Sequence, residues 1–123
     1  TTNVVFLYCP VRIVGPKVRN GVNALRGMAR PGDAAEYKLR AMQGGRYRVT
    51  ISEVELEGPE LPLSLRVDEE ELEFAVTGEE DLEIGEIELA EGDHLLTLDV
   101  PETATGQATL TRATALRFEM VDG

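Results

Sequence analysis

Apolar and polar residues alternate through much of the chain, and this period of two limits the fold more than any other feature. Between Arg46 and Ile51, apolar residues at Tyr47, Val49 and Ile51 alternate with arginine and threonine. That spacing is typical of a strand with one buried face. No segment keeps the i, i+3, i+4 apolar spacing of an amphipathic helix over about ten residues. The core must therefore be built by strands.

Turn residues divide this alternation into several short strands. The expected strands cover residues 4–8, 11–14, 46–51, 61–67, 71–76, 94–100 and 110–120, with 82–89 forming a strand pair or one bulged strand. A further strand, entered at Gly32–Asp33, carries Glu36 and Tyr37. We expect a bulge near Ser52–Glu53 and a hairpin turn at Gly44–Gly45, while residues 15–33 form a long loop crossing one end. The pattern predicts an all-β fold, a two-sheet antiparallel β-sandwich of jelly-roll type.

The length of 123 residues suits one domain, residues 1–123, with a single two-layer core. The chain begins at Thr1 without a methionine and looks like a piece excised from a longer multidomain protein. Its most apolar stretch, VVFLYCPVRIV, is about half the ~20 residues of a membrane helix and is interrupted by Pro10 and Arg12. We therefore expect no membrane partner.

Charge is unevenly distributed along the chain. Residues 1–52 carry a formal charge of +7, residues 53–93 carry −16 and the remainder −2, for a net charge of −11. The net sign argues against nucleic acid as a partner, because phosphate binding depends on Lys and Arg. The split itself has three readings: solvated strand faces, strands that pair inside one sandwich, or complementary patches that drive self-association.

Catalytic and metal-binding chemistry is sparse. The chain has one His, one Cys and two Ser, which argues against a nucleophile–base pair and excludes structural zinc. His94 follows a tight turn, where its ring is expected to bond locally, and Cys9 is expected to be a small buried hydrophobe. No loop has the spaced aspartate pattern of an EF-hand, so calcium stays open and no cofactor is predicted. We expect a protein that is not an enzyme.

Five motifs, in this order, resemble the carbohydrate-binding modules of families six and thirty-five: PGDAAEYKL, GGRYRVTI, LSLRVDEEEL, IELAEGDHLLTL and ATALRF. The resemblance covers about Gly27 to Phe118 and implies a galactose-binding-like β-sandwich, with Glu36 and Tyr37 as framework positions on a strand. As polar-tipped aromatics, Tyr37 and Tyr47 are expected in the core wall, with exposed ligand stacking as the alternative. It also implies a non-catalytic accessory module of an extracellular, glycan-active protein. Its partners would be a polysaccharide or oligosaccharide and a neighbouring catalytic domain of the same chain.

The residues with which these modules usually grip sugar have no counterpart here. The family uses an aromatic residue before the Gly-Asp turn, a Trp in a later loop and an Asn near the last strand, whereas residues 25–28, 79–81 and 109–114 contain neither aromatics nor Asn. The family's structural calcium is not carried over, because Val11, Arg12, Ile13 and Thr114 stand at its ligand positions.

Two interpretations follow from this departure. In the first, polar loop residues select acidic or amino sugars by charge and hydrogen bonding. The candidate ligand contacts are Arg26, Met28, Arg30, Glu80, Asp81 and Arg112. In the second, the sugar cleft is degenerate and the chain is a structural or protein–protein interaction module.

Overall fold

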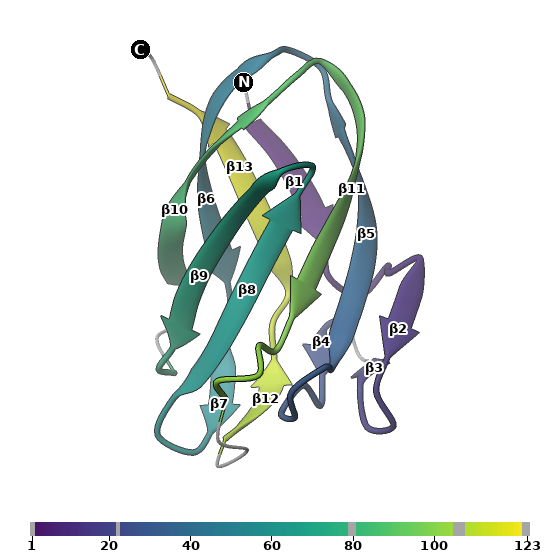
Figure 1. Ribbon diagram of the computed structural model, residues 1–123, viewed down its shortest axis with the longest axis vertical. Coiled ribbons are helices and arrows are strands. Elements are labelled where there is room, and N and C mark those ends of the chain that lie inside the picture. The colour runs from purple at the N-terminus through teal and green to yellow at the C-terminus, as the bar shows by residue number, and fades with distance from the viewer. Residues whose placement is uncertain (1, 22, 79–80, 105–107, 122–123) are drawn as a thin grey trace.

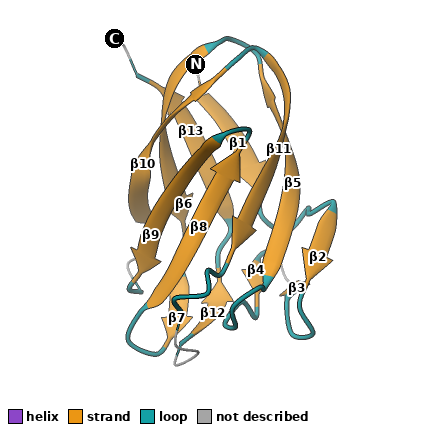
Figure 2. Cartoon of the chain, viewed as in Figure 1, coloured by secondary structure: helices purple, strands orange, loops and turns teal. Residues whose placement is uncertain are grey.

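A computed structural model describes residues 2–21, 23–78, 81–104 and 108–121, and within these ranges every regular element is a strand. The described residues include no helix long and apolar enough to cross a membrane. Most of the strands belong to two antiparallel sheets that lie face to face (Figure 1), and loops join them at the ends (Figure 2). The predicted two-sheet antiparallel β-sandwich is thus confirmed.

One sheet has four strands and the other has five. The four-stranded sheet has the order β1 (Thr2–Phe6), β13 (Ala115–Met120), β6 (Gly45–Ser52), β10 (Asp81–Leu89). The five-stranded sheet has the order β2 (Arg12–Val14), β5 (Ala34–Ala41), β11 (Gly92–Asp99), β8 (Leu61–Val67), β9 (Glu70–Val76).

Four short strands close one end of the sandwich. They are β3 (Arg19–Asn20), β4 (Leu25–Arg26), β7 (Glu55–Glu57) and β12 (Thr109–Arg112), which pair as β3–β4 and β7–β12. Backbone bonds from Leu25 N to Ala113 O (2.8 Å) and from Gly27 N to Leu110 O (2.7 Å) join β4 and the residue that follows it to β12 and the residue that follows it. The four strands therefore form one small layer, called here the cap. Its strands β3 and β4 lie where the sequence predicted only a loop from 15 to 33.

The core lies between the two sheets, and both predicted tyrosines are in it. Tyr37 and Tyr47 are fully buried, and their hydroxyls donate to the carbonyl oxygens of Leu7 and Gln43, respectively. Burial raises the pKa of Tyr37 well above its usual range, so its hydroxyl stays a donor. These contacts satisfy polar groups that would otherwise be costly to bury.

The structure corrects several local predictions. Gly44–Gly45 is not a hairpin turn, because β5 and β6 belong to different sheets and the chain crosses over between them. The expected strand 110–120 divides into β12 and β13, and the bulge expected at Ser52–Glu53 is instead the exit of the chain from β6 towards the cap, with a positive φ of 53° at Glu53. Residues 82–89 form one strand, with its register shift between Glu83 and Gly85.

The two residues with reactive side chains have different outcomes. His94 bonds locally as predicted, with Nε2 2.7 Å from the Ala90 carbonyl oxygen, and its Nδ1 lies 2.8 Å from Asp68 Oδ2. Cys9 is exposed, so the prediction that it is buried was wrong. The chain turns after β1, and Leu7 rather than Cys9 enters the core at this point.

Part of the charge split is neutralised inside one sheet. Strand β6 carries Arg46 and Arg48, and its neighbour β10 carries the facing glutamates. Arg46 lies 2.7 Å from Glu86, and Arg48 lies 3.1 Å from Glu83. The basic and acidic segments therefore pair within the sandwich at this place, as one of the three readings of the charge split predicted.

Replacing Tyr37 by Phe should lower the free energy of unfolding by about 1–3 kcal/mol, since the Leu7 carbonyl would lose its buried donor. Urea denaturation measures the change. Tyr8→Phe is the matched control, because the Tyr8 hydroxyl bonds to none of the described residues, and it should change stability by less than about 0.5 kcal/mol. Equal effects of the two variants would contradict a structural role for the Tyr37 hydroxyl.

Candidate functional site

The outer face of the cap contains a pocket of about 380 Å³. Four of its lining side chains are cationic, and no described Asp or Glu lines it. The lining residues are Lys17, Arg19, Arg26, Gly27, Ala29, Arg30, Thr109, Leu110 and Thr111. We call this the cationic pocket. In a chain of net charge −11, such a cluster is a local reversal of the overall charge.

The backbone of the pocket wall is fixed by two residues, Gly27 and Asp33. Gly27 has a φ of +88°, and a Cβ atom at this position would lie 1.9 Å from the carbonyl oxygen of Lys17. Asp33 is 5% exposed, and its Oδ2 accepts hydrogen bonds from the backbone N–H groups of Ala29 (3.0 Å) and Arg30 (2.9 Å). The turn that presents Arg30 is therefore held from the inner side by a buried carboxylate.

The cations of the pocket are held to different degrees. Arg26 donates from Nε to the Gly21 carbonyl (2.9 Å) and from a terminal nitrogen to the Thr111 carbonyl (2.7 Å). Arg19 donates to the Lys17 carbonyl at 3.2 Å. Arg30 is exposed, and like Lys17 it forms no ion pair with any described residue. Arg30 and Lys17 therefore keep their charged groups available to a ligand.

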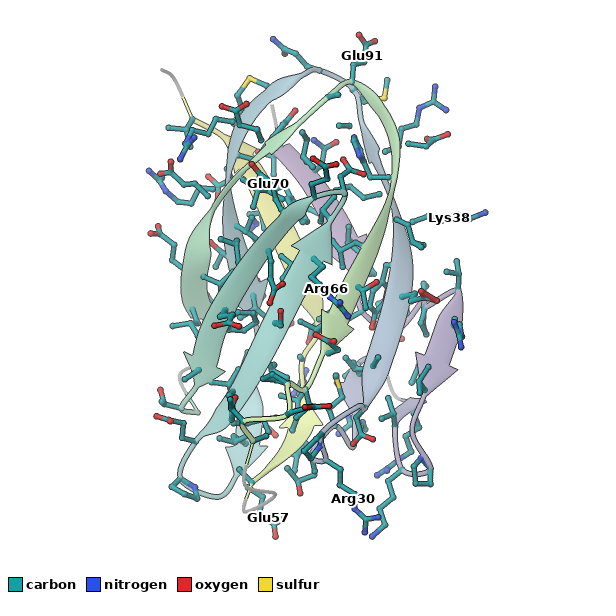
Figure 3. The ribbon with its side chains drawn as sticks, in the orientation of Figure 1. Arg30, Lys38, Glu57, Arg66, Glu70 and Glu91 are labelled. Atoms are coloured by element: carbon teal, nitrogen blue, oxygen red, sulfur yellow. The ribbon has the colours of Figure 1, made fainter. Side chains whose placement is uncertain are left out.

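Charge changes sign across the cap. Arg19 on β3 and Arg26 on β4 are cross-strand neighbours on one side of the cap. On the other side, Glu57 on β7 is the cross-strand neighbour of Thr109 on β12. Arg30 and Glu57 project from the same end of the sandwich (Figure 3), the end opposite Glu91. An anionic ligand is therefore attracted to one half of the cap and repelled by the other.

The predicted ligand contacts do not all converge. Arg26 and Arg30 line the cationic pocket as part of one site. Met28 is fully buried, which corrects its assignment as a contact: its side chain belongs to the core beneath the cap. Glu80 lies outside the described residues.

Asp81 on β10 and Arg112 on β12 do not line the cationic pocket. Asp81 Oδ1 accepts the backbone N–H of Glu53 at 3.2 Å. Arg112 lies 3.5 Å from Glu53 and 3.9 Å from Glu55, and it lines a second hollow of about 250 Å³ with Val54 and Gly78. The charge of Arg112 is therefore largely compensated by neighbouring carboxylates.

Lys17, Arg19, Thr109 and Thr111 are pocket residues that the sequence prediction missed. The sequence did indicate Lys17 and Arg19, since four of the nine Lys and Arg residues before residue 53 lie between positions 15 and 33. Residues 25–28 correspond to a sugar-contact position of the modules that the sequence resembles, and Lys17 and Arg19 lie outside that position. The threonines carry no such signal, because only the pairing of β12 with β4 brings them to the pocket.

The pocket is poorly suited to a divalent cation. Its side-chain donors are ammonium, guanidinium and hydroxyl groups, whereas calcium and magnesium take oxygen ligands that include carboxylates. Across residues 2–21, 23–78, 81–104 and 108–121, no three His, Cys, Asp or Glu side chains are grouped closely enough to hold a metal ion. The chemistry that the pocket favours is recognition of an anion.

Gly27→Ala should destabilise the protein by several kcal/mol more than Gly32→Ala, because only the Gly27 methyl group would collide with backbone. Gly32 is a matched control: its φ is +92°, and a Cβ there meets nothing within 4 Å, so that substitution carries only the conformational term of about 1–2 kcal/mol. Thermal and urea unfolding compare the two. Similar losses of stability in the two variants would show that the close contact between Gly27 and the Lys17 carbonyl does not restrict the residue at position 27.

No family model and no curated protein matches the sequence. Among solved structures, the CBM36-1 domain of a multidomain xylanase from the hindgut metagenome of Trinervitermes trinervoides aligns with a TM-score of 0.77 and 15% identity, covering 100% of both chains. A carbohydrate-binding module CBM36 in complex with calcium and xylotriose aligns with a TM-score of 0.70 and 13% identity, over 94% of this chain and 98% of that one.

A third structure is a larger enzyme, the Podospora anserina GH26-CBM35 β-(1,4)-mannanase, with a TM-score of 0.67 and 10% identity. The alignment covers 99% of this chain but only 28% of the mannanase. At these identities the likeness concerns the fold. This chain therefore shares the β-sandwich fold of these carbohydrate-binding modules.

Proposed function

We propose that this chain is a non-catalytic carbohydrate-binding module that binds acidic polysaccharides or oligosaccharides in the cationic pocket of the cap. The observation that carries the proposal is the grouping of Lys17, Arg19, Arg26 and Arg30 around a pocket that no described carboxylate lines. Charge-assisted hydrogen bonds from guanidinium and ammonium groups to carboxylate or sulfate are about twice as strong as neutral ones. They replace the aromatic stacking that the cap lacks.

The rest of the pocket suits a sugar. The hydroxyls of Thr109 and Thr111 lie between the cationic and acidic halves of the cap, where they can bond to ring hydroxyls. Among the described residues, no His, Cys, Ser or carboxylate side chain lines the cationic pocket, so the Lys17 amine and the hydroxyls of Thr109 and Thr111 have no such neighbour there to act as a general base. These features support binding without catalysis.

We further propose that the module is an accessory domain of an extracellular glycan-active protein, next to a catalytic domain of the same chain. The Podospora anserina mannanase supports this, since the part that aligns with this chain is only 28% of its length. The xylanase domain is likewise part of a multidomain enzyme. Both similar structures therefore come from enzymes with more than one domain.

Arg30→Ala should weaken binding to an acidic oligosaccharide about tenfold, equivalent to about 1.4 kcal/mol, since Arg30 is exposed and unpaired among the described residues. Binding to a glycan array followed by isothermal titration calorimetry measures the change. Arg40→Ala is the control, because Arg40 is an exposed arginine on β5 that does not line the pocket. Silence across neutral and acidic glycans would overturn the proposed function, and equal loss in both variants would overturn the site.

Binding should not depend on calcium. One similar module forms a complex with calcium and xylotriose, but the cationic lining of this pocket does not fit a divalent cation. The same titration in EDTA and in calcium should therefore give equal affinities. A loss of binding in EDTA that calcium restores would place the sugar site elsewhere on the protein.

A further inference from the structure

A buried carboxylate lies beside the cationic pocket and keeps one oxygen without a donor. Asp33 is 5% exposed, and its Oδ2 accepts the two backbone N–H bonds that hold the turn of Arg30. No described residue donates a hydrogen bond to the other oxygen, Oδ1. Nor is Oδ1 one of the described polar atoms that are enclosed without a partner, so it can still be reached. Such an oxygen requires a donor, because leaving it unsatisfied costs free energy.

The space beside Asp33 adjoins the cationic pocket. Asp33 lines a narrow hollow of about 10 Å³ together with Pro16, Lys17, Gly27, Ala29 and Arg30. The last four of these residues also line the cationic pocket, so a ligand held in the pocket has the hollow next to it. A space of about 10–15 Å³ accommodates one group of the size of a water molecule. The hollow is therefore a place for one small group of the ligand.

Glycine at position 15 leaves room against the same oxygen. Gly15 has a φ of +120°, and a Cβ atom there would collide with Asp33 Oδ1. A side chain at this position would therefore cover Oδ1, and glycine preserves the oxygen as an acceptor.

The charges around the hollow decide which small group fits it. Lys17 and Arg30 line it, and neither forms an ion pair with Asp33 or with any other described residue. An ammonium group in the hollow would meet these two like charges, and a second anionic group would meet the Asp33 carboxylate. A neutral hydroxyl avoids both repulsions and supplies the donor that Oδ1 requires.

We propose that the cationic pocket recognises two neighbouring groups of an acidic glycan. Lys17 and Arg30 bind the anionic group, and Asp33 Oδ1 accepts a hydrogen bond from a free hydroxyl beside it. This inference rests on the proposed function and narrows its ligand class to acidic glycans with unsubstituted hydroxyls. An O-acetyl or O-sulfate group has no donor and is larger than the hollow, so substitution would leave Oδ1 unpaired in the complex.

The first test compares two ligands on the wild-type protein by isothermal titration calorimetry. One is an oligogalacturonate, and the other is the same oligosaccharide after full O-acetylation, which keeps the carboxylates but removes every hydroxyl donor. We expect the free form to bind at least about tenfold more tightly. Equal affinities would overturn this inference and leave the proposed function standing. No binding of either form would overturn both.

Asp33→Asn tests the acceptor itself. The amide oxygen of Asn can accept the two backbone bonds that Oδ2 accepts, and the amide NH2 group then takes the place of Oδ1. The variant should bind the free form more weakly and the acetylated form more tightly, since the negative charge beside the ligand's anionic group is removed. The tenfold preference should fall to about threefold or less. Damage to the turn alone would weaken both ligands in the same proportion.

Asp99→Asn is the matched control. It makes the same change of charge on β11, and Asp99 lines neither the pocket nor the hollow, so this variant should keep the wild-type preference. Urea denaturation checks that both variants are folded, and the comparison of the two ligands on the wild type decides the need for a hydroxyl even if Asp33→Asn is not. A preference that survives in Asp33→Asn, or that is lost equally in both variants, would refute the role of Asp33.

Discussion

Each long strand of this protein has one apolar face, and the opposite sheet must cover that face for the strand to be stable. Tyr37 on β5 and Phe118 on β13 belong to one buried cluster although they lie on different sheets. The same requirement makes the chain cross repeatedly from one sheet to the other. Because the strands cross between sheets at the ends of the sandwich, apolar core residues there must be shielded from solvent. At one end the cap shields them with buried side chains from residues 18 to 28.

Period-two alternation predicted the strands well, because a strand that buries one face leaves a local record in the sequence. Tyr47, Val49 and Ile51 are all buried on β6, as their spacing indicated. Local alternation does not show which strand pairs with which. The connection at Gly44–Gly45 has residues typical of a hairpin turn, but it joins β5 in one sheet to β6 in the other. Cys9 was misjudged for the same reason, since an apolar run does not reveal where the chain leaves the core.

The candidate site was predicted in part. Charge indicated Arg26 and Arg30, and both line the pocket. Met28 has the same neighbourhood in sequence but faces the core, because alternation in a segment as short as β4 and its continuation is too brief to assign a face. Arg112 does not line the pocket and is paired with Glu53 and Glu55 instead. The sequence could not show this, because the pairing of β7 with β12 connects positions more than fifty residues apart.

The carbonyl contacts of Arg26 have a consequence for how the pocket would select ligands. Two of its donors are fixed by Gly21 and Thr111 before any ligand arrives, so this side chain loses little rotamer freedom on binding, whereas Arg30 and Lys17 must still be ordered. Preorganised charge of this kind favours affinity by lowering the entropy lost in the complex. The cap therefore combines a held cation, Arg26, with adaptable ones, Arg30 and Lys17. In the proposed function, this arrangement would accept anionic groups at varied positions along a glycan while keeping one point of attachment fixed.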